Sequence, residues 1–247
     1  MRVFGLIPAR LESSRLPEKA LLDFWGHPMI YHVAKRAELC NQLDKVIVCT
    51  DSSKIAEICL SSGINVCLTK DSHSNGTERI AEAAQIIGAE NNDIIIDIQG
   101  DEPLVNPDTI TNVVNFSKEM SHDLVVPYLE ISDGDDPNRV KLVTSGENVI
   151  YMSRQNVPYQ FINETKIKKH LSIIGFKFSA LQEFSRRKRT ELESIEGVEL
   201  LRAIEIGLRV GTFKENIESL SVDTSEDYER AVRMMKHDLV YLEYFHG

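Results

Sequence analysis

The sequence predicts an α/β fold with a mostly parallel central sheet, and three observations support this. Short β-branched runs alternate with segments of helical periodicity through the first half of the chain. The run Asp93–Ile98 is nearly all aliphatic, as in a central strand covered on both faces. A length of 247 residues with 42% hydrophobic content suits one folded core, and no linker or repeat interrupts it. We therefore expect a single domain over residues 1–247.

In the first half, strands alternate strictly with helices. We expect strands over Val3–Ile7, Lys45–Thr50, Ile64–Leu68 and Asp93–Ile98. Helical spacing predicts helices around Met29–Ala37, over Ser53–Ser62, over Thr77–Ile87 and from Pro107, with Asn106 as its N-cap. In parallel sheets of this kind, ligands lie beyond the carboxyl ends of the strands, so functional residues are expected in the loops that follow them.

The second half is less regular, and some of its strands are expected to be antiparallel. Strands are predicted over Leu124–Leu129, Val140–Thr144, Leu171–Phe178 and Leu220–Val222. A helix is predicted over Glu191–Gly207. Thr224 or Ser225 is expected to cap one last amphipathic helix, whose apolar side carries Tyr228, Ala231, Val232, Met235 and Leu239.

Charge and composition exclude several classes of protein. The formal net charge of −10 argues against a nucleic-acid partner, and the basic run Arg186–Arg189 is interpreted as solvated surface. We expect no membrane insertion and no signal peptide, because no apolar run is long enough. The four cysteines lack zinc-site spacing, and Cys49 and Cys67 lie in apolar, strand-like runs where buried thiols are expected. These features together predict a cytoplasmic protein.

The loop after the first strand is rich in cations. Arg10, Arg15 and Lys19 fall within ten residues, and such a cluster is stabilised by an anion. Ser13 and Ser14 add hydrogen-bond donors. The sequence contains neither a P-loop nor a G-x-G-x-x-G motif. The loop is therefore interpreted as a site for a nucleoside triphosphate, with an ordinary solvated loop as the alternative.

Two aspartates are candidate metal ligands. Asp101 follows Gly100 at the end of the most hydrophobic strand, where a hard oxygen ligand for Mg²⁺ is expected. Asp223 directly precedes the last helix, whose cap it is not needed to supply. Together they would form a two-carboxylate Mg²⁺ site, completed by triphosphate oxygens. A turn or surface role is the alternative for each, and Glu102 is a rival ligand.

The segment His73–Arg79 contains a polar turn that leads into a helix. Free N–H groups at such a helix start can bind an anion, and Ser74 and Asn75 can bond a base or ribose. Arg79, one turn later, can face an anionic group. A plain helix cap with a solvent-exposed arginine is the alternative.

These segments, in this order, resemble the 3-deoxy-manno-octulosonate cytidylyltransferases (CMP-Kdo synthetases). The matching stretches are IPARLESSRLPEKAL, GTERIAEA, DIQGDEPLV, DPNRVKLV, YMSRQNVP, KHLSIIGF, ELESIEGVELLRA and VDTSEDYERA. The resemblance implies a three-layer GT-A-like nucleotidyltransferase fold with a smaller mixed β/helical part for sugar binding and dimerisation. It also implies a homodimer that transfers CMP from CTP to the anomeric hydroxyl of Kdo or a modified Kdo, releases pyrophosphate and serves lipopolysaccharide biosynthesis.

By the same resemblance, each candidate residue receives a role. The catalytic residues would be Arg10, Arg15, Lys19 and Asp101. The nucleotide would be bound by Ala9, Arg10, Ser14, Arg15, Lys19, Ser74, Asn75, Gly76, Arg79 and Asp101. Asp101 and Asp223 would hold Mg²⁺. The sugar acid would be bound by Gln99, Arg154, His170 and Glu199, with Arg154 as the candidate for its carboxylate.

The sequence departs from the family pattern at several places near the expected site. Glu18 stands where the family has glycine, and Asn75 replaces a serine. Ile174 and Leu200 replace a tyrosine and a glutamine, so two groups expected near the sugar are aliphatic. Our hypothesis is that the acceptor differs from standard Kdo, for example as an amino- or deoxy-substituted octulosonate. The alternatives are a cytidylyltransferase for another acidic sugar, such as a nonulosonate, and a non-catalytic nucleotide-binding protein.

Overall fold

The computed structural model describes residues 1–13, 15–119, 121–132, 135–162 and 165–246. Within these ranges most strands join one ten-stranded sheet, in the order β10-β8-β9-β12-β7-β11-β6-β1-β4-β5, and β2 pairs separately with β3. The strands are β1 Val3–Ala9, β2 Asp23–Phe24, β3 His27–Pro28, β4 Lys45–Thr50, β5 Val66–Leu68, β6 Ile94–Ile98, β7 Leu124–Ile131, β8 Lys141–Ser145, β9 Asn148–Ser153, β10 Ile167–His170, β11 Ile173–Lys177 and β12 Val210–Lys214.

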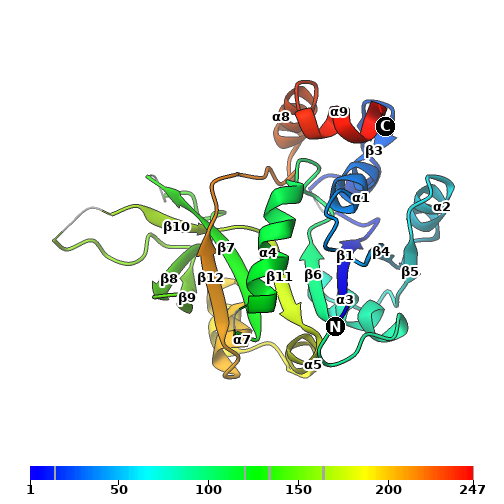
Figure 1. The fold of residues 1–247 in the computed structure, drawn as a ribbon. Coiled ribbons are helices and arrows are strands. Elements are labelled where there is room, and N and C mark those ends of the chain that lie inside the picture. The colour runs from blue at the N-terminus through cyan, green and yellow to red at the C-terminus, as the bar shows by residue number, and fades with distance from the viewer. Residues whose placement is uncertain (14, 120, 133–134, 163–164, 247) are drawn as a thin grey trace.

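The helices form a layer on each face of this sheet (Figure 1). Their bounds are η1 Lys19–Leu21 (a 3₁₀ turn), α1 Met29–Glu38, α2 Ser53–Ser61, α3 Gly76–Ile86, α4 Pro107–Glu119, α5 Phe178–Arg186, α6 Glu191–Glu196, α7 Leu201–Glu205, α8 Ser225–Met235 and α9 Leu239–His246. The apolar sides of α1, α2 and α4 pack on one face. Those of α3, α5 and α7 pack on the other, which gives the predicted three layers.

The first half is a parallel sheet, as predicted. β1 pairs in parallel with β4 on one side and with β6 on the other, so the carboxyl ends of these strands meet at one edge. In the second half β11 runs antiparallel to β6 and β7, and the sheet becomes mixed. Because β11 is antiparallel to β6 and begins with Ile173 opposite Ile98, the segment that precedes β11 lies at the carboxyl end of β6.

Three second-half predictions were wrong in detail. The predicted strand Leu220–Val222 does not pair with any strand of the described sheet; its backbone is held by a bond from Val222 N to Asp101 O at 2.9 Å. The predicted helix Glu191–Gly207 breaks at Gly197, where φ is +62°, into α6 and α7. The predicted last helix ends at Met235, so Leu239 belongs to α9. The prediction also missed β9, β10, β12, α5 and α9 as separate elements.

The capping chemistry agrees with the sequence. Thr224 caps α8, with Asp227 completing a capping box, and Asn106 Oδ1 accepts a bond from Asp108 N at the start of α4.

All four cysteines are buried free thiols. In the described ranges no helix is both long and apolar enough to span a bilayer.

A buried ion pair fixes the segment between α6 and α7. The Arg202 guanidinium donates to both carboxylate oxygens of Glu193, at 2.8 and 2.6 Å, and each side chain is 3% exposed. Burial opposes the charge of Glu193, but the bonds from Arg202 lower the pKa of that carboxyl. The pair therefore anchors the stretch that carries Glu199 against the sheet.

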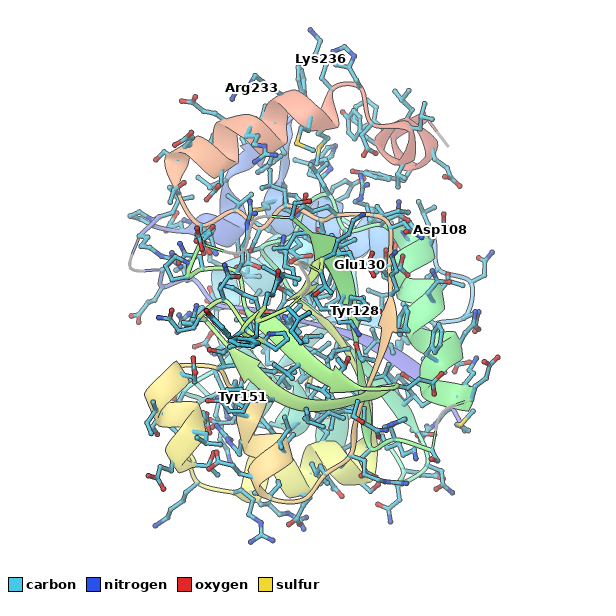
Figure 2. All side chains as sticks on the ribbon, turned by 90° about the vertical axis from the view of Figure 1, so that its left-hand side faces the viewer. Asp108, Tyr128, Glu130, Tyr151, Arg233 and Lys236 are labelled. Carbon is cyan, nitrogen blue, oxygen red and sulfur yellow. The ribbon has the colours of Figure 1, made fainter. Side chains whose placement is uncertain are left out.

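We predict that Glu193→Gln destabilises the fold by about 3–5 kcal/mol, because it leaves the buried Arg202 charge unpaired. Urea unfolding at pH 7 measures this. Glu229→Gln is the control: its partner is Arg233, which projects from the outer side of α8 (Figure 2), and both side chains are 68% exposed. That change is expected to shift stability by less than about 0.5 kcal/mol. Equal losses in the two variants would contradict a structural role for the buried pair.

Candidate active site

A cavity of about 360 Å³ opens at the carboxyl ends of β1 and β6. This is the edge that the parallel alternation predicted for ligands. The loop after β1, the start of α3, the turn after β6 and the residue before α8 all contribute to it. Its walls are formed by Pro8, Ala9, Arg10, Glu12, Ser13, Arg15, Lys19, Ala20, Met29, His73, Ser74, Asn75, Gly76, Arg79, Gln99, Gly100, Asp101 and Asp223.

Lys19 lies between the two predicted metal ligands. Its Nζ is 2.7 Å from Asp101 Oδ2 and 3.0 Å from Asp223 Oδ1. Burial opposes its charge, but the two carboxylates raise the pKa of Lys19 above its usual value. The ammonium group is therefore charged throughout the neutral range and offsets the repulsion between two converging acids.

The other loop cations stand at the rim of the cavity. The Arg15 guanidinium is 3.0 Å from Asp223 Oδ1 and its side chain is 62% exposed. Arg10 is exposed and also lines the cavity. Both guanidinium groups are thus accessible to an anion that enters. Ser14, the remaining predicted loop residue, falls outside the described residues.

Two local constraints bring Asp101 and Asp223 together across 122 positions of sequence. Gly100 lies so close to β1 that a Cβ there would be 2.5 Å from Pro8 O, so this turn requires glycine. The bond from Val222 N to Asp101 O then holds the second aspartate beside the first. The capping box at Thr224 and Asp227 leaves the Asp223 carboxylate free to face Lys19.

The two carboxylates suit a hard divalent cation. Their oxygens already converge on one ammonium group, and carboxylate oxygens are the ligands that Mg²⁺ prefers. Within the described residues, no group of three or more His, Cys, Asp or Glu side chains could hold a metal by itself. Any ion here would therefore need oxygen ligands from a bound phosphate as well. Glu102, the rival ligand, is buried and lines a second cavity instead.

The start of α3 forms one wall of the cavity. Asn75 is the N-cap of this helix, since its Oδ1 accepts a bond from Glu78 N at 2.8 Å. Gly76 packs against β1, and a Cβ there would be 3.0 Å from Pro8 Cγ. Arg79 is buried and contacts Asp51 and Thr69, although it also lines the cavity. The capping role that we held as an alternative therefore applies to Asn75, whereas Ser74 stays exposed at the rim.

The predicted sugar-binding residues are not all in one place. Gln99 lines the first cavity, and His170 lines a neighbouring cavity of about 420 Å³ that shares Arg15 and Asp223 with the first. Burial lowers the pKa of His170 to about 4, so its ring is neutral at pH 7. Burial likewise raises the pKa of Glu199 to about 7, and its Oε2 accepts a bond from Thr77 Oγ1 at 3.2 Å.

Arg154 is separated from these groups. Its guanidinium donates to three backbone carbonyls, those of Pro137, Glu196 and Gly197, each at 2.9 Å. It lines neither cavity. By contrast, Arg139 and Lys169, which the sequence reasoning did not select, line the second cavity. Their basic side chains had no pattern that distinguished them from surface residues.

Sequence reasoning also missed Asp97. It is an acid inside the otherwise aliphatic strand β6, and it is fully buried. A lone carboxyl in such a strand was the signal that could have identified it, because an ionisable group there needs a partner.

The departure at Glu18 has a structural explanation. Its backbone is left-handed, with φ at +51°, a conformation that favours the glycine of the family pattern. Its carboxylate accepts two bonds from Lys54 Nζ on α2, at 2.8 and 2.7 Å. The negative charge is thus paired with α2.

The comparisons with known proteins agree with this geometry. A sequence model of the cytidylyltransferase family matches residues 4–217. The fold, the basic loop and the match together define a nucleotidyltransferase. The 3-deoxy-manno-octulosonate cytidylyltransferase of Syntrophobacter fumaroxidans is 38% identical over 97% of this chain and 99% of its own. That of Nitratiruptor sp. is 37% identical over 91% and 96%.

The solved structures include a similar fold with a nucleotide. The structure of CMP:2-keto-3-deoxy-manno-octonic acid synthetase complexed with CTP superposes with a TM-score of 0.91. It is 29% identical and covers 97% of this chain and 100% of its own. The chain belongs to the 3-deoxy-manno-octulosonate cytidylyltransferase family.

We predict that Glu18→Gly is more stable than Glu18→Ala by about 1 kcal/mol. Both variants lose the exposed pair with Lys54, but alanine keeps the cost of the left-handed backbone and glycine does not. Urea unfolding of the two variants measures the difference directly. An alanine variant as stable as the glycine variant would show that the conformation of this loop is unstrained.

Proposed function

We propose that this chain transfers CMP from CTP to the anomeric hydroxyl of a 3-deoxy-2-keto sugar acid of the Kdo type and releases pyrophosphate. The observation that supports this most directly is the position of Lys19 Nζ between Asp101 and Asp223 at a cavity rimmed by Arg10 and Arg15. An activated sugar acid of this kind would serve lipopolysaccharide biosynthesis. A cytoplasmic location, where CTP is available, stays a prediction.

The chemistry needs positioning and charge stabilisation more than a covalent intermediate. The anomeric hydroxyl oxygen forms a bond to the α-phosphorus in line with the leaving group. The bond from that phosphorus to the bridging oxygen breaks, pyrophosphate leaves with the electron pair, and the hydroxyl proton passes to solvent. Arg10, Arg15 and Lys19 would neutralise the charge that develops on the phosphate oxygens.

The remaining residues would hold the two substrates. Ala9, Ser74, Gly76 and Arg79 line the wall along which the nucleotide would lie. Gln99 and His170 line the two cavities and would face the sugar acid, whereas Glu199 lines neither cavity and would act from behind the wall. Mg²⁺, held by Asp101 and Asp223, would supply Lewis-acid neutralisation of the triphosphate. For the carboxylate of the sugar acid, Arg139 and Lys169 are better placed than Arg154, because both line the second cavity, where Lys169 is paired with Glu218.

The proposal is tested by a pyrophosphate-release screen of CTP and UTP against a panel of 3-deoxy sugar acids. We expect release with CTP and an octulosonate, dependent on Mg²⁺ and abolished by EDTA. Controls without sugar acid measure hydrolysis of the nucleotide. Binding of CTP with no release for any acid in the panel would overturn the proposal in favour of a nucleotide-binding protein.

Lys19→Ala is expected to lower kcat by about 10²–10³-fold while the KM for the sugar acid changes little, because Lys19 would act on the phosphate groups. Steady-state kinetics at saturating CTP measures both constants. Lys236→Ala is the matched control, since Lys236 projects into solvent from the end of α8 (Figure 2) and should leave both constants as they are. An unchanged kcat in Lys19→Ala would refute the role.

We also propose that the chain is a homodimer. The segment between β9 and β10 projects from the sheet (Figure 1), and it exposes three large apolar side chains, Tyr159, Phe161 and Ile162, at 85%, 85% and 84%. Such a cluster supports a protein contact, since isolated monomers rarely expose one.

Light scattering should therefore give about twice the chain mass of 28.0 kDa. Phe161→Asp is expected to shift the population toward monomer, because a charge would be buried in the contact. Leu60→Asp on α2, at a site with 61% exposure, is the control and should stay dimeric. A monomeric wild-type chain at micromolar concentration would contradict the proposal.

A further inference from the structure

Asp97 is a carboxyl group in the middle of the sheet. It is 0% exposed and lies in register between Leu6 of β1 and Ile174 of β11, so both of its lateral neighbours are aliphatic. Its Oδ1 accepts a bond from Gln99 Nε2 at 3.0 Å. Its Oδ2 is buried and has no hydrogen-bond partner anywhere in the described chain.

A second carboxyl group near Asp97 is also incompletely paired. Glu199 Oε2 is bonded to Thr77, whereas its Oε1 is buried and lacks a partner among the described residues. Burial and the nearby charges of Glu199 and Asp101 raise the pKa of Asp97 well above its usual range. Arg202 lies near Glu199, but its hydrogen bonds go to Glu193 and a backbone carbonyl. Among the described residues, therefore, no Lys or Arg side chain is hydrogen-bonded to either of these two carboxyl groups.

Neither carboxyl group lines the substrate cavity, but each lies close behind its wall. Gln99, which donates to Asp97, lines that cavity, and so does Gly76, the neighbour of the Thr77 that binds Glu199. Asp97 is thus one side chain behind the cavity wall. A ligand group that displaces the Gln99 amide would reach it.

A structural role in the sheet does not explain why position 97 is an aspartate. Asp93, at the opposite end of the same strand region, is also buried, but its two oxygens accept bonds from Arg2 and Glu90. Asp97 has no such set. An asparagine would fill the same volume without the cost of a buried ionisable group. The carboxylate is therefore explained better by a ligand than by packing.

We propose that Asp97, together with Glu199, selects an acceptor sugar acid that carries an ammonium group in place of one hydroxyl. This inference rests on the proposed cytidylyl transfer and names the substrate class for the same site. An ammonium group has three N–H donors and a positive charge, so it satisfies both free oxygens and neutralises the excess of acid. A hydroxyl offers one donor and no charge. Ile174 and Leu200 leave no polar side chain at their own positions to favour the hydroxyl form.

The test compares Kdo with octulosonates in which one hydroxyl at a time is replaced by an amino group. Pyrophosphate release with CTP and Mg²⁺ gives kcat/KM for each acceptor. For one amino isomer, the wild-type enzyme is expected to show a preference over Kdo on the order of 100-fold or more, because a buried polar site left unpaired discriminates strongly. In Asp97→Asn this ratio should fall to less than about tenfold.

Thermal unfolding provides a second readout that does not depend on turnover. Without substrate, Asp97→Asn should raise the Tm by about 2–4 °C, because it removes an unpaired buried acid. The preferred amino acceptor should then stabilise the wild-type chain more than the variant. Asp93→Asn is the matched control: it should lower the Tm, since it loses the Arg2 pair, and keep the wild-type ratio of acceptors.

The outcomes separate this inference from the function on which it rests. Kdo used as well as every amino isomer, or an acceptor ratio that Asp97→Asn does not move, would overturn the ammonium site and leave cytidylyl transfer intact. No pyrophosphate from any acceptor would overturn the transfer reaction itself. A lower Tm for Asp97→Asn would show that the acid supports the fold, and would also count against the inference.

Discussion

The contact of one ammonium group with two carboxylates holds the site together. Lys19 follows β1, Asp101 follows β6 and Asp223 precedes α8, so the three come from segments separated by as many as 204 residues. Without the cation, two acids would converge at the carboxyl edge of the sheet and repel each other. Two features of the surrounding structure position the acids next to Lys19: the close approach of Gly100 to β1 and the backbone bond from Val222 N to Asp101 O.

The same arrangement makes physical sense for a nucleotidyltransferase. A site rich in acids repels a triphosphate, and a site rich in cations alone would bind the pyrophosphate product too tightly. Here a basic loop and a pair of carboxylates line one cavity and touch through Lys19 and Arg15. The cavity therefore offers cations for phosphate and carboxylates for a divalent cation side by side.

Ionisable groups divide into paired and unpaired sets across the molecule. Glu193 and Glu18 have their charges matched by Arg202 and Lys54, and they act in positioning the segments around the site. Asp97 and Glu199 are buried without such a match, and they lie behind the wall of the cavity. Among the described residues, these two are the acids that bury an oxygen without a hydrogen-bond partner, which is the basis for the proposed substrate contact.

Prediction from sequence was most successful where local physics decides the outcome. Alternating periodicity identified the main-sheet strands and the α-helices from β1 to α4, although it missed η1 and the short pair β2 and β3, and capping residues located the starts of α4 and α8 within a residue or two. In the second half the elements are short and mixed, and β9, β10 and β12 pair with distant partners. Their stability comes from those partners, so their own residues carry little signal.

The sequence by itself determined where the charged residues meet, because cations and acids at strand ends come together at one edge of a parallel sheet. Only the tertiary structure decided which of the candidate side chains bind other parts of the protein. It binds Arg154 to three carbonyls, turns Glu18 toward Lys54 and makes Asn75 a helix cap. It also brings Glu199 near enough to Asp97 for its charge to raise the pKa of that carboxyl, although 102 residues separate them in the chain. Such pairings depend on long-range packing, which the local pattern of residues does not encode.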